Sequence, residues 1–370
     1  MFLQRLTLSN FKNYVEAEMQ FSEKINCFIG ENGAGKTNIL DAIYYLSFCK
    51  SYFNAIDQQN IRHDESFFSV HGFYETNGSA SDQVSCIQKR NQKKVFRLNQ
   101  KDYDRLADHI GKIPLVMISP YDRDLINEGS EIRRKFIDGV ISQFDPVYLN
   151  GLITYNKALV QRNTLLKQFA ERNYFDHDLL KVYDKQLLHS ADTIYNKRLS
   201  FLSDFIPIFN NYYSFVSGGK ETVDIIYDSG LHQQSLQTLL DEALPRDRQA
   251  RFTTVGLHKD DLDFRIQTHP LKKFGSQGQQ KSFVIAIKLA QFDYTRQVMG
   301  YKPVLLFDDI FDKLDDHRVG QLIRLVGNDS FGQVFITDTQ QERIERLFAG
   351  SNIDHRIFSV VSGQVHQFQA

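Results

Sequence analysis

The stretch Gly30-Glu31-Asn32-Gly33-Ala34-Gly35-Lys36-Thr37 decides the fold of this chain. It fits the pattern G-x-x-x-x-G-K-[ST], follows an apolar run over 25–29, and precedes a helical pattern over 37–46. The glycines let consecutive backbone N–H groups converge on phosphate oxygens, and the start of the next helix adds partial positive charge. We predict that this loop and Asn38 bind a nucleotide, with Lys36 reaching the β- and γ-phosphates and the Thr37 hydroxyl joining the coordination of Mg²⁺.

A second candidate element is the apolar strand 303–307, which ends in Asp308 and Asp309. An apolar strand that ends in an acid beside a phosphate loop is where a P-loop enzyme holds its metal, so Asp308 is predicted to bind Mg²⁺. Asp309 is predicted to orient the attacking water. Two acids that simply cap a surface strand are the alternative, which the phosphate loop makes the weaker one. Lys36, Asp308 and Asp309 are therefore the candidate catalytic residues of an ATPase.

Length and composition set broad limits. A chain of 370 residues is longer than one compact domain of average size, which favours two lobes or one core with a large insertion. Hydrophobic residues at 42% and charged residues at 24% exclude disordered and collagen-like classes. The net charge of −1 means that a nucleic-acid partner must meet a local basic patch.

The cysteines and the apolar runs indicate the cellular compartment of the protein. Three cysteines without CxxC spacing argue against a disulfide framework and a thiolate zinc site, and they fit a reducing cytosol. No run has the length of a signal peptide or a membrane span. We expect a cytoplasmic protein with no membrane partner.

The pattern along the chain predicts an α/β core interrupted by helices. Strand-like runs occur at 3–8, 25–29, 68–74, 83–89, 95–98, 223–227, 304–307, 334–337 and 357–361. From about 130 to 215 the period is helical, with one apolar stripe from Leu152 to Phe169 interrupted by Arg162 and a second from Leu180 to Leu202. The polar stretch 171–173 between them predicts a helical hairpin. The predicted domains are 1–119 and 251–370 for the core and 120–250 for the helical lobe.

A third motif narrows the family. Phe274-Gly275-Ser276-Gln277-Gly278-Gln279-Gln280-Lys281-Ser282 resembles the signature motif of ABC-type ATPases, and its wording resembles the RecF family of DNA-repair proteins. Segments that agree with that family are 10–14 (NFKNY), 119–120 (SP), 133–138 (RRKFID) and 256–262 (GLHKDDL). The resemblance extends from about residue 1 to residue 340.

The resemblance implies an ABC-type P-loop ATPase core like the heads of Rad50 and SMC proteins, with a short inserted helical arm. It implies an ATP-driven homodimer in which Ser276, Gly278 and Gln279 of one copy bind the ATP held by the other. It further implies binding to gapped DNA at junctions of single and double strands, cooperation with RecR and RecO, and help in loading RecA. Its ATPase activity would be weak and DNA-stimulated, serving recombinational repair and replication-fork recovery.

Several positions depart from the family or from ABC ATPases in general. Asp309 stands where many ABC ATPases have glutamate, which implies slow turnover. Thr337 lies where transporters carry a switch histidine, so its hydroxyl would sense the γ-phosphate. The stretch 312–315 would be a dimer-contacting loop. Gln58 or Gln59 would be a Gln-loop residue, and a polar surface turn is the alternative for these two. The stretch 52–54 lacks an arginine that the family often has.

A basic hairpin is the candidate DNA-binding surface. No acid occurs between Asp82 and Asp102, and the tip of the hairpin is predicted near 91–92. The cations of this segment are Lys89, Arg90, Lys93, Lys94, Arg97 and Lys101. Recognition of DNA backbone and shape is expected, since no base-reading motif is present. A merely solvated hairpin face is the alternative. Arg133, Arg134 and Lys135 are a second candidate, or else they pair with acids of the arm.

Three functions fit these motifs. The first is an ATP-gated DNA clamp that releases DNA after slow hydrolysis. The second is the nucleotide-binding subunit of an ABC transporter, against which the helical insertion, the Gln-rich signature and the missing histidine all argue. The third is a chromosome-organising ATPase head in which ATP is bound and hardly hydrolysed.

Overall fold

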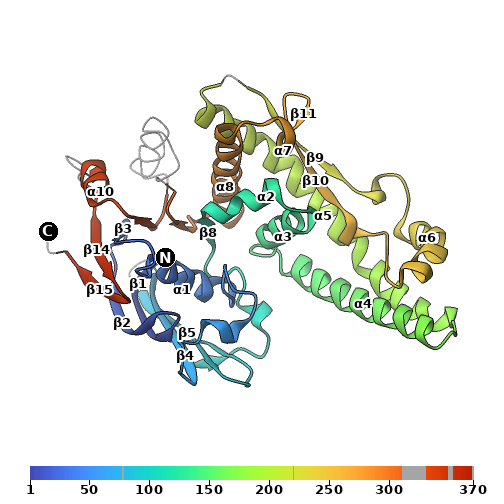
Figure 1. The fold of residues 1–370 in the computed structure, drawn as a ribbon, viewed down its shortest axis with the longest axis horizontal. Helices are drawn as coiled ribbons and strands as arrows, with labels where there is room; N and C mark the ends of the chain where they lie inside the picture. The colour runs from blue at the N-terminus through green and yellow to red at the C-terminus, as the bar shows by residue number, and fades with distance from the viewer. Residues whose placement is uncertain (77–78, 220, 311–330, 349–352, 369–370) are drawn as a thin grey trace. The chain divides into compact units, whose positions relative to one another are not determined.

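A computed structural model describes residues 1–370 except 77–78, 220, 311–330, 349–352 and 369–370. It contains two compact units, whose elements are labelled in Figure 1. The sheet unit comprises Met1–Asp122 and Thr295–Ala370, and the helical unit comprises Arg123–Tyr294.

The centre of the sheet unit is a largely parallel sheet in the order β15-β14-β3-β13-β12-β8, with β15 antiparallel to β14. Its strands are β15 (Gln364–Gln367), β14 (His355–Val361), β3 (Ile25–Ile29), β13 (Val334–Asp338), β12 (Val304–Phe307) and β8 (Leu115–Ile118). Every residue of β3, β13, β12 and β8 is buried. Continuous apolar runs of this kind are typical of strands covered on both faces.

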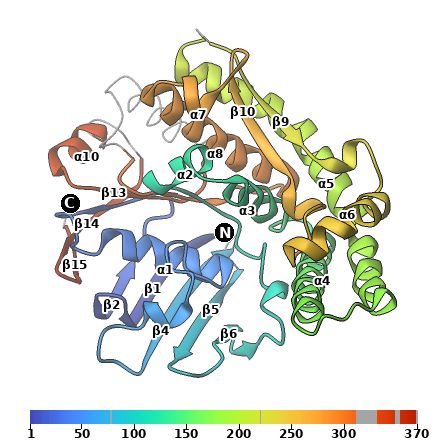
Figure 2. The ribbon, with the colours of Figure 1, turned by 45° about the vertical axis from the view of Figure 1, so that its right-hand side comes forward.

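A second, antiparallel sheet has the order β2-β1-β4-β5-β6-β7. Its strands are β2 (Tyr14–Gln20), β1 (Phe2–Phe11), β4 (Phe67–Thr76), β5 (Ser79–Lys89), β6 (Val95–Leu98) and β7 (Lys101–Asp102). Figure 2 shows α1 (Lys36–Phe48) lying between the two sheets. One apolar core joins all three layers, with Leu6 from β1, Ile43 from α1 and Phe335 from β13. This core fixes the position of the loop that precedes α1.

Among the described residues of the sheet unit, the remaining helices are short. They are η1 (Asp57–Asn60), η2 (Leu106–Asp108) and α10 (Gln341–Phe348). The helix η3 (Pro120–Arg123) joins the first part of this unit to the helical unit.

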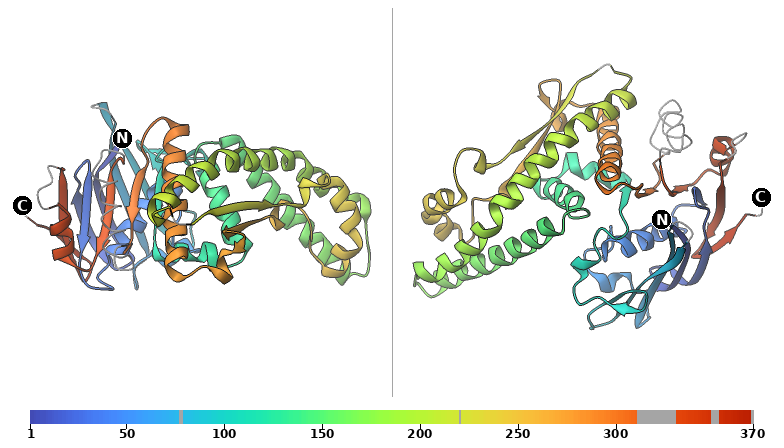
Figure 3. Two further views of the ribbon diagram at one scale, coloured as in Figure 1. Left: turned by 90° about the horizontal axis from the view of Figure 1, so that it is seen from above. Right: turned by 180° about the vertical axis from the view of Figure 1, so that it is seen from behind.

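The helical unit is built around two long helices, α4 (Pro146–Glu171) and α5 (His177–Ser217), which Figure 3 shows side by side. Asp145 and Asp176 cap them, each accepting a hydrogen bond from a backbone N–H of the first turn. The other helices are α2 (Asp124–Asn127), α3 (Ser130–Ile141), η4 (Gly230–His232), α6 (Leu236–Ala250), η5 (Leu257–Lys259), α7 (Leu271–Phe274) and α8 (Gln277–Met299), of which α8 belongs to this unit as far as Tyr294. A small antiparallel sheet has the order β11 (His269–Pro270), β10 (Asp261–Ile266), β9 (Val223–Asp228). The predicted helical hairpin is confirmed.

Arg162 interrupts the apolar stripe of α4 with a charge that lies on the buried face of the helix. Its side chain is fully buried, and it donates to Asp184 of α5 (Nε to Oδ1, 2.6 Å) and Asp247 of α6 (Nη1 to Oδ2, 2.7 Å). Arg198 of α5 is buried in the same way between Asp138 and Asp260. Both arginines therefore tie neighbouring elements of the helical unit together.

The structure divides the chain differently from the predicted boundaries. Residues 251–294, expected in the ATPase core, lie in the helical unit. The reason is long-range pairing: β10 pairs with β9 over six residue pairs, and Phe283 of α8 packs on Phe209 of α5 with ring centroids 4.7 Å apart. The signature segment therefore belongs to the helical unit.

Two further observations concern cysteines and membranes. Cys27, Cys49 and Cys86 are all free and buried. Within the described ranges, no helix combines the length and apolar character that a membrane crossing requires.

Candidate nucleotide-binding site

The glycine loop connects the end of β3 to the start of α1, as the sequence predicts. Gly33 and Gly35 have φ angles of +81° and +118°, in the left-handed region that favours glycine. A Cβ atom at Gly30 would lie 2.2 Å from the carbonyl oxygen of Val360. The loop thus needs glycine for its backbone path at two positions and for close packing at the third.

The side chain of Lys36 is held inside this loop. Its Nζ donates to the carbonyl oxygens of Gly30 (2.8 Å) and Glu31 (2.9 Å), and the residue is buried. These contacts keep the ammonium at the loop, where a phosphate group would meet it together with the backbone N–H groups.

Four of the predicted residues meet where three parallel strands and the loop end. Thr37 Oγ1 donates to Asp308 Oδ1 (2.7 Å), and Thr337 Oγ1 donates to the same oxygen (3.0 Å). The backbone N–H of Asp309 donates to Thr337 Oγ1 (2.8 Å). We name Thr37, Asp308, Asp309 and Thr337 the strand-end cluster.

The electrostatics of this cluster suit a cation. Burial raises the pKa of the Asp308 carboxyl to about 6, and the neighbouring Asp309 carboxylate also raises it, whereas the hydrogen bond from Thr37 lowers it. A nearby cation favours the ionised form of such a buried acid. Carboxylate and hydroxyl oxygens are the donors that Mg²⁺ prefers, so Thr37 and Asp308 fit this ion.

Asp309 has an unusual backbone conformation. Its φ angle is +44°, which non-glycine residues adopt uncommonly. The hydrogen bond from its N–H to Thr337 supports this conformation. Strained residues of this kind are concentrated at functional sites, which agrees with a role for Asp309 in the chemistry.

The turn between β1 and β2 braces the glycine loop, a role that sequence reasoning missed. Asn13 Nδ2 donates to the Ala34 carbonyl (3.0 Å), and Asn13 Oδ1 accepts from Asn38 Nδ2 (2.7 Å). The hydroxyl of Tyr14 donates to the Gly35 carbonyl (3.0 Å). In the sequence, the segment 10–14 carries only a family resemblance, and nothing in its spacing indicates this contact.

Replacing Asn13 with alanine is expected to weaken ATP binding about fivefold, because a hydrogen bond of this kind contributes about 1 kcal/mol. Isothermal titration calorimetry with ATP measures the change. Asn211→Ala, in an exposed part of α5, is the matched control and should bind ATP as the unmodified chain does. Equal affinities for both variants would show that the brace does not act on the loop.

The signature residues lie at the start of α8 in the helical unit. The Ser276 N–H donates to Gln279 Oε1 (2.6 Å), and the Gln279 N–H donates back to Ser276 Oγ (3.3 Å), which forms a capping box. Gln279 Nε2 also donates to Glu221 Oε1 (2.6 Å). Gly278 follows Ser276 in the first turn, and its carbonyl accepts from Ser282. The capping box thus satisfies backbone N–H groups at the helix start, where Ser276 is exposed.

Other predicted positions are placed as follows. Gln58 is half-buried and Gln59 is exposed, and both lie in η1. In the stretch 52–54, the backbone N–H of Tyr52 donates to Asp41 of α1 (2.7 Å). The predicted dimer-contacting loop at 312–315 lies outside the described residues.

Some cations of the basic hairpin are paired with acids, and others are exposed. Lys94 is held by Asp57 (Nζ to Oδ2, 2.7 Å), and Arg97 is paired with Asp102 of β7. Arg90 is exposed, although its Nε donates to the Glu65 carbonyl. The exposed lysines of the segment are Lys89, Lys93 and Lys101.

The second basic candidate pairs with acids. Arg133 holds Asp261 with two hydrogen bonds (2.6 and 2.9 Å), and Arg134 donates to the Asp260 carbonyl. Lys135 pairs with Glu131 on the surface of α3. These contacts join the segments 133–138 and 256–262.

The sequence of this chain is similar to that of known proteins. The family model of the RecF/RecN/SMC N-terminal domain matches residues 2–360. The chain belongs to this family. A Flavobacterium johnsoniae protein named DNA replication and repair protein RecF is 52% identical over 97% of this chain and 100% of its own length. A Phocaeicola vulgatus protein of the same name is 49% identical over 99% of this chain and 98% of its own length.

Two solved structures bear on the family and on the fold. A structure described as the recombination mediator protein RecF with ATP in the RecFOR pathway superposes with a TM-score of 0.90 at 28% identity, covering 100% of this chain and 98% of that one. The Smc head domain of Pyrococcus furiosus has a TM-score of 0.57 at 16% identity, covering 100% of this chain and 96% of that one, which shows a shared fold. The predicted ABC-type core with an inserted helical arm and the RecF resemblance are both confirmed.

Proposed function

We propose that this RecF-family chain is an ATP-dependent DNA-binding protein of recombinational repair and replication-fork recovery. Two copies would bind ATP between them, close on DNA at a gap junction, and release it after slow hydrolysis. The observation that carries the proposal is the strand-end cluster beside the glycine loop. Relatives of about half identical sequence along the whole chain are named DNA replication and repair protein RecF, which disfavours the transporter alternative.

Each residue of the site would have a defined role. Backbone N–H groups of the loop and the Lys36 ammonium would hold the phosphates, and Thr37 and Asp308 would hold Mg²⁺. When bound, Mg²⁺ supplies charge neutralisation at the β- and γ-phosphates. Asp309 would orient the attacking water. Because its carboxylate is one methylene shorter than that of glutamate, we expect weak ATPase activity. Stimulation of this activity by DNA is expected from the family resemblance.

A second copy would complete the site. Ser276, Gly278 and Gln279 would approach the γ-phosphate held by the partner copy, and the capping box keeps the start of α8 ready for this contact. Thr337, whose hydroxyl links Asp308 to the backbone of Asp309, would report the presence of the γ-phosphate. ATP then shifts the population toward the dimer because it binds the closed form more tightly.

The expected protein partners are RecR and RecO, and indirectly RecA. Support comes from the similar RecF structure, which is described within the RecFOR pathway.

Mass in solution tests the proposal directly. Light scattering of the purified chain should show a monomer without nucleotide and a doubled mass with ATP. Gapped duplex DNA should be retained with ATP and lost as salt rises. A chain that binds ATP and stays monomeric with or without DNA would contradict the clamp.

The exposed lysines of the basic hairpin should contribute to DNA binding. Replacing Lys89, Lys93 and Lys101 with glutamine is expected to make the log–log salt slope shallower by about 0.9 for each phosphate contact that is lost. Fluorescence anisotropy with gapped duplex at several salt concentrations measures the slope.

A control variant changes the charge by the same amount elsewhere. It replaces Lys157, Lys167 and Lys185, exposed lysines of α4 and α5, with glutamine. If both triple variants change the slope equally, the hairpin has no special part in binding DNA.

A further inference from the structure

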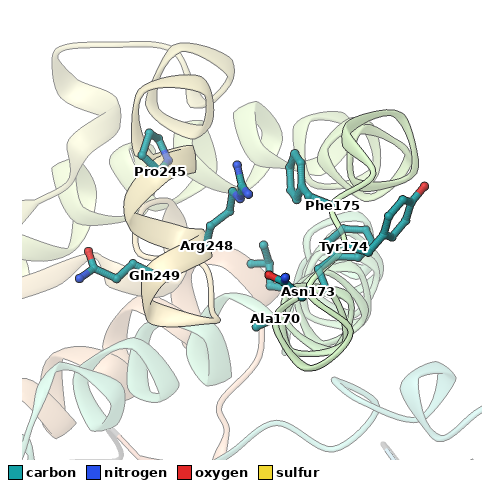
Figure 4. Close-up of a pocket in the computed structure, with 9 residues that line it drawn as sticks. Ala170, Asn173, Tyr174, Phe175, Pro245, Arg248 and Gln249 are labelled. Atoms are coloured by element: carbon teal, nitrogen blue, oxygen red, sulfur yellow. The ribbon is translucent and has the colours of Figure 1, made fainter.

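A pocket lies at the tip of the helical hairpin, where α4 ends, α5 begins and α6 packs against them. Its volume is about 430 Å³. Figure 4 shows Arg248 of α6 and Phe175 of the hairpin tip near one another, with Ala170 and Asn173 at the end of α4. None of these residues belongs to the nucleotide site or the basic hairpin.

The floor of the pocket is apolar. Leu166 and Phe169 line it, and with Leu180 they form a small buried cluster that is separate from the main core of the helical unit. Leu165, Phe175 and Leu244 pack partly buried against this cluster. An apolar side chain that entered the pocket would therefore continue an existing small core.

Arg248 supplies the polar recognition element. The centre of its guanidinium lies 4.1 Å from the centroid of the Phe175 ring, so one face of the group is stacked. Stacking holds the guanidinium in place and leaves its N–H edge able to bind a carboxylate with two hydrogen bonds. Within the part of the chain that the structure describes, no carboxylate forms an ion pair with Arg248.

Charge and exposure identify the kind of ligand. Arg248 is the one charged residue that lines the pocket, so the pocket complements an anionic group. Most of its walls are exposed side chains, including Asn173 and Gln249. An enclosed small-molecule site covers most of its ligand, whereas this open pocket would cover one side chain and its neighbour.

We propose that this pocket docks a peptide segment of a protein partner, in which an apolar side chain stands next to a carboxylate. The apolar side chain lies against Phe169 and Phe175, and the carboxylate pairs with Arg248. Arginine and aromatic residues at the centre of an interface often contribute most of the binding energy. The stacked Arg248 and the aromatic residues of the pocket are of this kind.

Peptide display on the full-length chain tests the proposal. Short random peptides displayed on phage are selected on the immobilised unmodified chain, with removal of those that also bind an Arg248→Glu variant. The selected peptides should carry an aspartate or glutamate beside a leucine, isoleucine or phenylalanine. Selection of peptides without an acid, or of none that depend on Arg248, overturns the proposal.

Titration of one selected peptide then measures the contribution of the charge. Arg248→Glu should weaken its binding at least about tenfold, since a charge-assisted pair is replaced by repulsion. Arg172→Glu makes the same charge change on an exposed residue that does not line the pocket, and it should alter binding by less than about twofold. Equal effects of both variants overturn the proposal.

A third variant separates volume from charge. Ala170→Phe places a ring in the pocket and keeps Arg248, so the selected peptide should again bind at least about tenfold more weakly. Far-UV circular dichroism and thermal unfolding confirm that each variant is folded. The same titrations with single-stranded DNA are run in parallel. Weaker DNA binding by Arg248→Glu, with unchanged peptide binding, would assign the pocket to nucleic acid and overturn the proposal.

Discussion

The Lys36→Arg variant is expected to remain monomeric with ATP at concentrations where the unmodified chain dimerises. The Lys36 ammonium is small enough to lie between the carbonyl oxygens of Gly30 and Glu31 inside the glycine loop. A guanidinium keeps the charge, but it is planar and wider, and it cannot take this place without moving the loop. Loss of a hydrogen bond from a charged group to phosphate should weaken ATP binding about 10- to 100-fold.

Light scattering with and without ATP measures the mass, and calorimetry measures ATP affinity on the same sample. Lys157→Arg, at an exposed lysine of α4, is the control and should dimerise normally. Normal dimerisation of Lys36→Arg would remove the link between this loop and assembly. Normal ATP binding without dimerisation would instead show that assembly depends on more than nucleotide occupancy.

The largest effect on stability is expected for Arg162→Leu. This change leaves the buried carboxylates of Asp184 and Asp247 without their cation, and Thr253 loses a donor at 2.9 Å. Removing one partner of a buried ion pair costs about 3–5 kcal/mol, because the remaining charge is neither paired nor solvated. Urea unfolding followed by circular dichroism at 222 nm reports the helical unit, and its midpoint should fall accordingly.

Two further variants separate the loss of charge pairing from other effects. Arg172→Leu, on an exposed arginine at the end of α4, should change the free energy of unfolding by no more than about 0.5 kcal/mol. Replacing Arg162, Asp184 and Asp247 together with apolar residues should recover much of the lost stability, because no buried charge is left unpaired. If Arg162→Leu unfolds at the same urea concentration as Arg172→Leu, the buried triad does not stabilise the unit.

Local sequence determined the elements that the nucleotide site is built on. Strand β3, the glycine loop and α1 form where the pattern placed them, and the strand over 304–307 ends at Asp308 as predicted. These features depend on apolar runs, helix periodicity and glycine conformations, which act between near neighbours in the chain. The strand-end cluster was predictable for a related reason, since parallel strands of a P-loop core bring their carboxyl ends to one edge.

Tertiary structure alone decided the remaining features. Asn13 reaches Ala34 only because the turn between β1 and β2 lies against the loop, and Arg162 is satisfied only because α5 and α6 supply Asp184 and Asp247. Lys94, one of the six cations of the basic hairpin, is paired because η1 places Asp57 beside it. Residues 251–294 join the helical unit through β9 and α5. Each of these contacts joins residues distant in sequence, and their side chains meet only when whole elements pack in one register, which no local pattern encodes.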